Sequence, residues 1–592
     1  MCGIIGYIGK EKCLDKIITG LQNLEYRGYD SSGIAYLKNK KVEIVKSKGR
    51  IEKLTKKIDS KVESFIGIGH TRWATHGKPS DVNSHPHKVG KITVVHNGII
   101  ENYNELKGGL LDYDFKSETD TEVVAALIDK FYKEDHDMLS VLQKLKYHLV
   151  GSYALGILVD GDEKIYAIRK DSPLIIGVSP NGNYIASDVP AILEFTNMYY
   201  LILNDEYAVL DKDEVIIYDS EGNVCPKNLY TFEGSKEAAQ KNGYEHFMLK
   251  EIHEQPKVVM DTIRPFLDNI KLMDEYHLDK YDHITIIGCG SAYHVGLVGK
   301  SLIMKYGHIQ VDVDIASEYR YTDHVYGKKE LIILISQSGE TADTLAVLRK
   351  AKEDHIDTLA IVNVVGSSIA READHVIYIK AGPEIAVATT KAYMCQLAIL
   401  SIMACYLGIK NHQLNKSVLK DYEELSTLMD ELITNDEDTK KIAKLIYQCK
   451  DVFYIGRKVD YALCMEASLK LKEVSYLHSE AYAAGELKHG TISLIESGTP
   501  VISIITDDDI ALKTISNVKE VVSREALSIV ITNQDVEDKE LYQEKIVIPK
   551  KIDLIESMLV IIKCQLIAYY VAKNNGCDID KPRNLAKSVT VE

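Results

Sequence analysis

The sequence has little positive charge and lacks the features that mark nucleic-acid-binding proteins. Its 71 lysines and arginines are outnumbered by 87 aspartates and glutamates, which gives a formal net charge of −16. Binding to a phosphate backbone needs a concentrated basic face, and we find none in the sequence. We therefore expect no nucleic-acid partner, while a small anionic substrate could still bind at a local site.

Long hydrophobic runs are also missing. The most apolar stretches, 394–409 and 558–572, are shorter than the roughly 20 residues that cross a bilayer, and the second contains Lys563. No basic segment followed by an apolar stretch precedes them at the start of the chain. We therefore expect two core helices, no membrane partner and a cytoplasmic protein.

The ten cysteines lack C-x-x-C spacing, which argues against a disulfide framework and against a zinc site. Most lie in apolar runs and are predicted to be small core residues. Cys2 differs, because removal of Met1 would make it the first residue. A terminal cysteine carries both a nucleophile and a base, since its own α-amine can take the proton of the thiol. Cys2 is therefore either a catalytic nucleophile or merely the beginning of a strand.

The order of strand-like and helical segments predicts several domains in the 592 residues. Residues 1–232 interleave short β-rich segments with helices, which is typical of a layered α+β domain. Residues 233–246 lose this periodicity and are assigned to a linker. The remainder alternates strands and helices twice, each time opening on a strand with a glycine turn, "IIGCGS" and "FYIGRK". We interpret this as a duplicated, doubly wound α/β domain, with copies at 247–430 and 431–580 and a tail at 581–592.

Polar residues gather at strand ends and turns of the first domain. Asn97 and Gly98 close an apolar strand and could donate hydrogen bonds to a tetrahedral oxyanion. Arg72 offers a planar fork for a carboxylate, and Asp120 could hold an α-ammonium group. The pattern indicates a pocket for a free amino acid beside a thiolate. A zinc site built on "HPH" (85–87) is the alternative, although no cysteine or carboxylate lies at ligand spacing.

These segments resemble the class II glutamine amidotransferase domain, an N-terminal-nucleophile hydrolase. The resemblance implies that Cys2 attacks the side-chain amide of glutamine and releases ammonia. It further implies that Asn97 and Gly98 form the oxyanion hole and that Arg72 and Asp120 bind the α-groups of glutamine. Matching motifs add four substrate-binding candidates: Trp73, whose loop gates an ammonia tunnel in the family, Thr75, His76 and His85.

A second polar motif, "SQSGETADT" (336–344), lies between a strand and a helix. Hydroxyls and N–H groups at a helix N-terminus suit a phosphate, while a plain helix cap is the alternative. The motif "GCGSAYHVG" (288–296) begins like a dinucleotide fingerprint. Tyr293 stands where its third glycine should be, and no ribose-binding acid follows. We therefore reject a nicotinamide cofactor and expect neither a cofactor nor a metal.

The second copy carries Glu466, Lys470 and Glu473 on one predicted helical face. Such a stripe usually faces solvent, but here "AYAAGELKHG" with His489 follows it. An aldose–ketose isomerisation needs a proton-transferring base, a ring-opening group and a group that polarises the carbonyl. Glu473, His489 and Lys470 have the corresponding chemistry. Lys587 belongs either to a frayed tail or to the site, as an amine nucleophile.

Both α/β copies resemble sugar isomerase (SIS) domains. The whole chain resembles the family of isomerising amidotransferases that move nitrogen from L-glutamine to D-fructose 6-phosphate, on the strength of "MCGI", "SQSGETADT", "AYAAGELKHG" and "DKPRNLAKSVTVE". The resemblance implies D-glucosamine 6-phosphate and L-glutamate as products and a homodimer as the assembly. It makes Glu473 the isomerisation base, His489 a ring-opening group from the neighbouring subunit, and Lys587 the Schiff-base residue.

The implied sugar-binding residues are spread over both copies and the tail: Ser291, Ser336, Gln337, Ser338, Thr341, Val387, Glu466 and Ala586. Two positions depart from the family pattern. Ala292 stands where serine is common and Ala386 where glycine is common, which bears on sugar affinity and not on the type of reaction.

Three other functions fit parts of the sequence. A fructosamine-phosphate deglycase or sugar phosphate isomerase with an inactive glutaminase half is opposed by the intact set of Cys2, Arg72, Asn97 and Asp120. A sugar-phosphate sensor would need an output module, and none is recognisable. A phosphoribosyl amidotransferase would have no reason to carry the duplicated half.

Overall fold

The computed structural model describes residues 2–59, 61–232 and 241–590. Residues 233–240 of the predicted linker and residues 591–592 of the predicted tail lie outside the described residues, as do residues 1 and 60. The chain forms two compact units, one made of residues 1–239 with 586–592 and the other of residues 240–585. Each unit is described by itself below.

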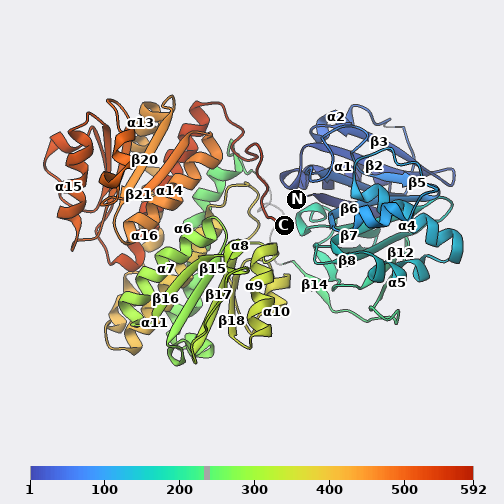
Figure 1. Cartoon of the computed structure of the whole chain (residues 1–592), viewed down its shortest axis with the longest axis horizontal. Helices are drawn as coiled ribbons and strands as arrows, with labels where there is room; N and C mark the ends of the chain where they lie inside the picture. Colours follow the sequence, from blue (N-terminus) through green and yellow to red (C-terminus); the bar gives the residue numbers. More distant parts are fainter. Residues whose placement is uncertain (1, 60, 233–240, 591–592) are drawn as a thin grey trace. The chain divides into compact units, whose positions relative to one another are not determined.

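The first unit contains two antiparallel sheets (Figure 1). The larger has eight strands in the order β14-β11-β9-β10-β1-β4-β2-β3, and the smaller has six in the order β13-β12-β8-β7-β6-β5. The strands of the larger sheet are β1 Gly3–Gly9, β2 Ser31–Lys38, β3 Lys41–Lys48, β4 Ile66–Arg72, β9 Ile175–Ser179, β10 Gly182–Ala186, β11 Met198–Leu201 and β14 Leu229–Thr231. Those of the smaller sheet are β5 His87–Val89, β6 Ile92–Ile100, β7 Gly151–Val159, β8 Ile165–Lys170, β12 Tyr207–Leu210 and β13 Val215–Tyr218.

The two sheets pack face to face, with helices on their outer faces. Ile4 and Ile8 of β1 share one core with Val95 of β6 and Leu158 of β7, because alternate side chains of a strand point to the same face. The helices are α1 Cys13–Asn23, α2 Ile51–Thr55, α3 Tyr103–Gly108, α4 Asp120–Asp135 and α5 Met138–His148. Helices α4 and α5 cover the smaller sheet through a second core, and α1 packs on β1 and β4. This is the α+β domain predicted from the sequence.

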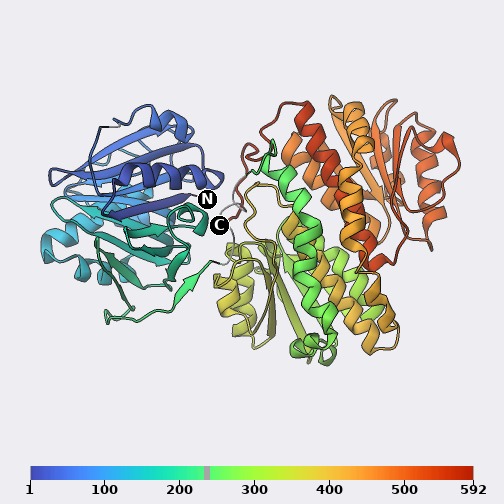
Figure 2. The ribbon, with the colours of Figure 1, turned by 180° about the vertical axis from the view of Figure 1, so that it is seen from behind.

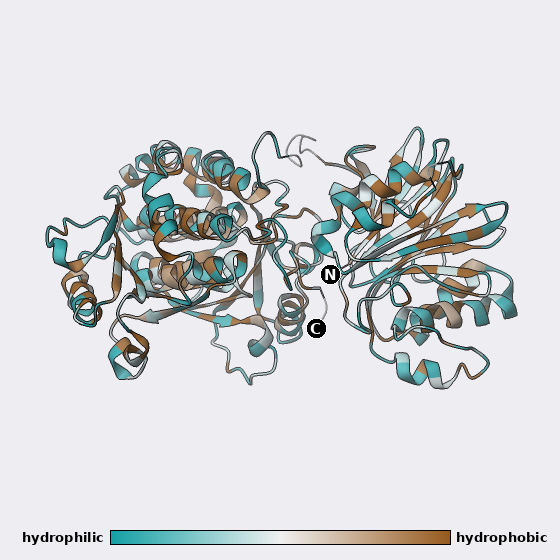
Figure 3. Ribbon diagram, turned by 90° about the horizontal axis from the view of Figure 1, so that it is seen from above, coloured by the Kyte–Doolittle hydropathy of each residue, from teal (hydrophilic) through white to brown (hydrophobic). Residues whose placement is uncertain are grey.

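Figure 3 shows the residue pattern behind this packing: hydrophobic and hydrophilic residues alternate along strands and around helices. Local signals then set the helix ends. The side chain of Thr119 accepts the backbone N–H of Glu122 and begins α4, and the carboxylate of Asp137 accepts the N–H groups of Leu139 and Ser140 to begin α5.

The second unit contains two parallel five-stranded sheets with the same topology, β16-β15-β17-β18-β19 and β21-β20-β22-β23-β24. The strands are β15 His283–Gly288, β16 Gln310–Ile315, β17 Glu330–Ser336, β18 Asp357–Val362, β19 His375–Tyr378, β20 Asp451–Gly456, β21 His478–Ala483, β22 Pro500–Ile505, β23 Leu527–Thr532 and β24 Glu544–Val547. The helices are α6 Phe247–Asp268, α7 Ser291–Gly307, α8 Ala316–Tyr319, α9 Ala342–Glu353, α10 Ser368–Glu372, α11 Lys391–Lys410, α12 Leu425–Thr434, α13 Glu437–Ile446, α14 Val459–Ser475, α15 Ala511–Val522 and α16 Asp553–Asn574.

Backbone geometry supports the predicted duplication. The turn after the first strand of each copy holds one residue in the same unusual conformation, Gly290 at φ 56° and ψ −123° and Lys458 at φ 49° and ψ −122°. Both residues immediately precede a helix of 17 residues, α7 or α14. The two copies are therefore α/β folds of one kind, as predicted.

Helices α11 and α16 are long and apolar enough to cross a membrane by length and composition, yet 94% of each apolar window is buried within the protein. They lie in one continuous core with α6, α7 and α14, and Figure 2 shows the long helix α6 running beside them. Both apolar stretches are core helices, as the sequence predicted.

Candidate active sites

Cys2 lies just before β1, with its sulfur against the backbone of Trp73. The N–H of Trp73 donates to Cys2 Sγ at 3.3 Å, and Sγ lies 3.5 Å from the carbonyl oxygen of the same residue. Burial raises the pKa of the Cys2 thiol, while the Trp73 N–H and the charge of Arg72 act in the opposite direction. The sulfur therefore lies in a site that already provides a hydrogen bond and a positive charge for a thiolate.

Asn97 and Gly98 lie within β6, which continues past them to Ile100, whereas the sequence predicted that they end the strand. Asn97 Nδ2 donates to the carbonyl oxygen of Cys2 at 2.9 Å. Gly98 has φ +127°, and a Cβ there would lie 2.0 Å from the carbonyl oxygen of Ser152. Only glycine fits at this position, so the backbone beside Asn97 is held in a shape that other residues cannot adopt.

Arg72 ends β4 and is buried, with 3% of its surface exposed. Its Nη2 donates to the carbonyl oxygen of Gly77 at 3.0 Å and also to that of His76. The guanidinium therefore holds the loop after β4, while its Nη1 has no hydrogen-bond partner among the described residues. An unpartnered buried donor is costly, which is consistent with a ligand carboxylate completing this site.

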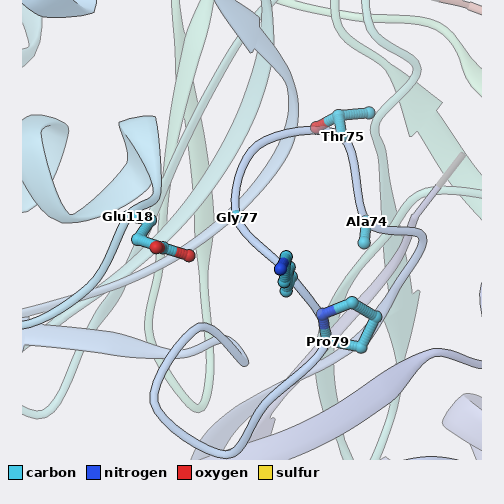
Figure 4. A pocket seen from close by; sticks show the side chains of 6 residues that line it. Ala74, Thr75, Gly77, Pro79 and Glu118 are labelled. Carbon is cyan, nitrogen blue, oxygen red and sulfur yellow. The ribbon is translucent and has the colours of Figure 1, made fainter.

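That loop forms one wall of an open hollow of about 540 Å³ (Figure 4). Its lining residues are Ala74, Thr75, Gly77, Lys78, Pro79 and Glu118. The backbone N–H of Ala74 donates to the carboxylate of Asp30 at 2.9 Å, which fixes the start of the loop. The hollow is large enough for an amino acid and is bounded by the segment that Arg72 holds.

Asp120 is the first residue of α4 and is buried. Its Oδ2 accepts the backbone N–H of Ile100 at 2.9 Å, at the end of the strand that carries Asn97. The charges of Asp120 and Arg72 both act on the Cys2 thiol, in opposite directions. The structure thus places the four residues with the clearest sequence-predicted roles, Cys2, Arg72, Asn97 and Asp120, around one point.

The remaining glutaminase candidates lie at different depths. Trp73 is partly buried and contacts Tyr29 edge to face, and the ring of His76 packs against Tyr103. Thr75 is exposed on the loop. His85 is 4% exposed, and its ring stacks on that of His70 at 4.2 Å between centroids. No group of three or more potential ligands that could hold a metal ion occurs among the described residues, "HPH" included.

The SQSGETADT motif forms a ring of hydroxyl and N–H groups between β17 and α9. Ser336 Oγ and Thr341 Oγ1 lie 2.9 Å apart, and Ser336 Oγ accepts the N–H of Gly339 at 3.0 Å. Ser338 Oγ accepts the N–H of Glu340 at 3.2 Å, and Gln337 is partly exposed beside it. A loop of this kind at the N-terminus of a 12-residue helix suits a dianionic phosphate.

A buried polar cluster joins the two α/β copies. From α7, Ser291 Oγ donates to Glu466 Oε1 of α14 at 2.9 Å, and His294 Nδ1 lies 2.9 Å from Glu466 Oε2. One turn along α14, Lys470 Nζ lies 3.4 Å from Glu466 Oε1 and donates to Glu473 Oε2 at 2.6 Å. The stripe that could have faced solvent is thus covered by α7.

Charge coupling within this cluster keeps Glu466 and Lys470 ionised. Burial alone would raise the pKa of Glu466, but Lys470 and His294 lower it below its ordinary value. Burial alone would lower the pKa of Lys470, yet the carboxylates of Glu473 and Glu466 outweigh it and raise that pKa. Lys470 is therefore a fixed ammonium group hydrogen-bonded to Glu473.

The loop before α11 is fixed by carboxylates. Glu384 Oε1 accepts the N–H groups of Thr390 and Ala392 at the beginning of the helix, at 2.9 and 3.1 Å. The N–H of Ala386 donates to Glu251 at 3.2 Å, and that of Val387 donates to the carbonyl oxygen of Asp580 at 3.0 Å. Val387 is therefore held against the segment that leads into the C-terminal tail.

His489, Ala586 and Lys587 complete the predicted set. His489 is exposed at the end of η7 Leu487–His489, and within the described part of the chain no hydrogen bond or ion pair joins its ring to Lys470 or Glu473. Ala586 and Lys587 are partly buried and group with the first compact unit. Their roles stay predictions.

The second α/β copy has a different loop at the position of SQSGE. After β22 the chain reads Thr506-Asp507-Asp508-Asp509, where the first copy has Gln337-Ser338-Gly339-Glu340 after β17. Lys458 lies 3.2 Å from Asp507, and Lys550 lies 2.9 Å from Asp508. Asp507 and Asp508 stand where the first copy has Ser338 and Gly339, and these two added carboxylates repel a phosphate. The copies therefore share a fold and differ in the anion site.

Sequence reasoning missed three site residues: Asp30, His70 and His294. The first two contact Ala74 and Asn97, and both contacts come from tertiary packing that the sequence does not reveal. His294 did carry a signal, because it lies three positions after Ser291 and so on the same face of α7.

Comparisons with known proteins agree with this geometry. A glutamine amidotransferase domain model matches residues 70–194, and a SIS domain model matches residues 277–406 and 445–572. The chain is 49% identical over 612 residues to the glutamine–fructose-6-phosphate aminotransferase (isomerizing) of Clostridium tetani and 44% identical over 605 residues to that of Staphylococcus epidermidis, with 100% of each chain covered.

Among solved structures, the C-terminal domain of glucosamine-fructose-6-phosphate aminotransferase from Francisella tularensis matches with a TM-score of 0.55 and 35% identity, over 58% of this chain and 99% of that one. Tagatose-6-phosphate ketose/aldose isomerase from Escherichia coli matches with a TM-score of 0.50 and 16% identity, over 58% of this chain and 96% of that one, and so shows the fold alone.

A glutamine amidotransferase domain joined to a pair of SIS domains defines a class of amidotransferases that pair a glutaminase with a sugar isomerase fold. Within that class, its identity to relatives along their whole length shows that this chain belongs to the glutamine–fructose-6-phosphate aminotransferase (isomerizing) family.

Proposed function

We infer that the chain transfers the amide nitrogen of L-glutamine to D-fructose 6-phosphate and isomerises the product to D-glucosamine 6-phosphate, with release of L-glutamate. The observation that carries the nitrogen-releasing half is the geometry at Cys2: its sulfur accepts an N–H from Trp73, its carbonyl accepts Asn97, and Arg72 and Asp120 act on the same thiol. The names of the full-length relatives indicate fructose 6-phosphate as the acceptor of the nitrogen.

In the glutaminase half, the proposed sequence of events begins with removal of Met1. The freed α-amine takes the thiol proton, and Cys2 Sγ attacks the amide carbon of glutamine. Asn97 and Gly98 donate to the resulting oxyanion, Arg72 binds the α-carboxylate and Asp120 the α-ammonium. Ammonia leaves, and water then releases glutamate from the thioester.

In the isomerase half, the phosphate is held by Ser336, Ser338 and Thr341 at the N-terminus of α9, with Gln337, Val387, Ser291, Glu466 and Ala586 around the sugar. The amine of Lys587 condenses with the ketone of fructose 6-phosphate, losing water to form an imine. Ammonia from the glutaminase half then displaces the lysine from C2 of this imine, which regenerates the Lys587 amine and leaves the new nitrogen on the sugar. Glu473 moves the proton between C1 and C2, and its hydrogen bond to the Lys470 ammonium keeps it oriented.

Glutamine labelled with ¹⁵N in its side-chain amide tests the overall reaction. Purified protein incubated with this glutamine and fructose 6-phosphate is expected to produce ¹⁵N-labelled glucosamine 6-phosphate. Unlabelled amino sugar, or glutamate without amino sugar, would contradict the transfer. Mass spectrometry of the intact N-terminus checks the first step, because a retained Met1 would block the α-amine.

Replacement of the two proposed nucleophiles separates the two halves. Cys2→Ala is expected to lower glutamine hydrolysis by at least about 10³-fold while fructose 6-phosphate still binds with unchanged affinity. Lys587→Arg is expected to abolish borohydride trapping of the sugar while glutaminase activity persists. Trapping that survives in Lys587→Arg would exclude that lysine.

We further propose that the enzyme is a cytoplasmic homodimer in which His489 acts on the sugar of the neighbouring subunit. The exposure of His489 supports this assignment. Inactive His489→Ala and Glu473→Gln subunits, mixed under conditions that exchange subunits, should regain activity, because one site of the hybrid then has both residues intact. Persistent inactivity of a verified hybrid would contradict action across the interface.

A further inference from the structure

The side chain of Asn97 is bound at both ends. Its Nδ2 donates to the carbonyl oxygen of Cys2 at 2.9 Å, and its Oδ1 lies 3.2 Å from His70 Nε2. Asn97 is 3% exposed and His70 is fully buried, so water does not compete for either contact. An amide nitrogen has two hydrogens, which leaves one on Nδ2 for a ligand beside Cys2.

The backbone determines which hydrogens these groups carry. His70 Nε2 also lies 2.9 Å from the carbonyl oxygen of His96. Because a carbonyl oxygen only accepts, Nε2 must hold the ring hydrogen. The Asn97 atom that faces Nε2 must then be an acceptor, Oδ1, which puts the Nδ2 donor on the Cys2 side. The His96 carbonyl, through His70, thereby selects one of the two amide orientations of Asn97.

Both the protonation state and the position of the His70 ring are fixed by its surroundings. Burial, with help from the charge of Arg72, lowers the pKa of His70 to about 3, so the ring stays neutral wherever the protein is folded and active. The ring of His85 stacks on it at 4.2 Å and 24° between planes. A Cβ at Gly33 would lie 2.2 Å from the carbonyl oxygen of His85, so β2 holds the backbone of His85 closely.

We propose that His70 is a positioning residue for nitrogen release, which orients the Asn97 amide so that its N–H faces the oxyanion formed beside Cys2, with His85 as the support of its ring. The inference rests on the proposed function, because it assigns Asn97 to the oxyanion. His70 itself touches no substrate and acts through Asn97 alone.

Substitutions at His70 test this role through kcat. His70→Phe keeps a ring for stacking and removes the donor, and is expected to lower kcat for glutamine hydrolysis about 10- to 100-fold with less than about a threefold change in KM, since a lost oxyanion donor costs about 10²- to 10³-fold. His70→Gln can place an amide N–H at the position of Nε2 and should recover most of the activity, whereas the shorter His70→Asn should not.

Two further measurements distinguish positioning from general damage. Alkylation of Cys2 by iodoacetamide needs no oxyanion and should proceed within about threefold of the wild-type rate in His70→Phe. In an Asn97→Ala background, His70→Phe should cost nothing more, because its only effect has already been removed. Ser64→Ala removes a hydroxyl that lies 2.7 Å from the carbonyl oxygen of Leu37 and 3.0 Å from that of Ile66, just before β4. It is the stability-matched control and should keep its kcat.

The outcomes separate the two proposals. If the wild type hydrolyses glutamine and His70→Phe has the same kcat, the role of His70 is overturned and the proposed function stands. The same holds if the losses in kcat from His70→Phe and Asn97→Ala multiply in the double variant. Equal losses in His70→Gln, His70→Asn and His70→Phe also overturn it, because they indicate a packing defect. A wild-type protein without glutaminase activity overturns the proposed function and this inference together.

Discussion

At the scale of single residues, burial controls the charge of Asp460. This aspartate lies in the first turn of α14, where it is 1% exposed, and its carboxylate accepts both the N–H and the hydroxyl of Thr506. Burial outweighs these hydrogen bonds and raises the pKa of Asp460 to about 7. The folded protein therefore retains a proton that the unfolded chain releases at lower pH.

The pH dependence of stability follows from this difference. Between the ordinary pKa of 3.8 and about 7, the folded state binds more protons than the unfolded state, so this residue lowers stability as the pH rises through that window. Asp460→Asn removes the effect. The free energy of unfolding of the variant should rise relative to that of the wild type as the pH goes from 5 to 8. The expected difference at pH 8 is about 1–3 kcal/mol, because each tenfold change in proton affinity corresponds to roughly 1.4 kcal/mol.

Denaturant unfolding of both proteins at a series of pH values measures this gain. The exposed Asp509→Asn, in the loop that carries Thr506, is the control and should show no such trend. A difference between Asp460→Asn and the wild type that is the same at every pH would contradict the assignment.

The sequence predicted individual site residues where chemistry and motif coincide. Cys2, Arg72 and Asp120 have side chains whose reactivity can be recognised without a structure, and the structure brings them together. His70 could not be assigned in this way, because its contact with Asn97 depends on how β4 packs against β6. A histidine in an apolar run has the same sequence signature whether it fills space or orients an amide.

At the scale of secondary-structure elements, the turn between β20 and α14 is strained. Lys458 has φ 49° and ψ −122°, a conformation that its counterpart in the first copy adopts as Gly290. A residue with a side chain loses about 1–3 kcal/mol in such a region. The duplicated turn thus retains its shape in the second copy although its glycine is absent.

Lys458→Gly is therefore expected to stabilise the second unit. The relief of strain exceeds the added freedom of the unfolded glycine, about 0.5–1 kcal/mol, and the loss of an exposed ion pair to Asp507, below about 1 kcal/mol. The net gain should be about 1 kcal/mol, seen as a higher midpoint of denaturant unfolding. Lys458→Ala loses the ion pair but keeps the strain, so a glycine variant no more stable than the alanine variant would contradict the prediction.

Elements were predicted well where the signal is local. The paired series of strands in residues 283–547 could be predicted from short apolar runs and the turn residues that end them. The burial of the Glu466–Glu473 stripe could not be predicted from the sequence, because the same spacing suits a solvent-exposed face. Its burial is decided by the packing of α7 on α14 and by the pairing of Ser291 and His294 with Glu466.

At the scale of the whole molecule, the domain order was accessible from the sequence because the pattern of strand-like and helical segments changes between the halves. The grouping of residues 586–592 with the first unit was not, since it is a property of the folded chain and not of any motif. The predicted tail thus includes residues from both units, with residues 581–585 grouped with the second. Asp580, just before the tail, accepts the N–H groups of Phe247 and Met248 in the second unit.

The acidic loop at Asp507, Asp508 and Asp509 predicts one sugar phosphate site for each polypeptide. A duplicated fold could have given two saturable sites per polypeptide, and a calorimetric titration with fructose 6-phosphate is instead expected to reach its equivalence point at one molar equivalent. A titration that ends at two equivalents would show that the second copy still binds ligand. An equivalence point at one molar equivalent would mean that gene duplication doubled the architecture while only one copy kept the capacity to bind ligand.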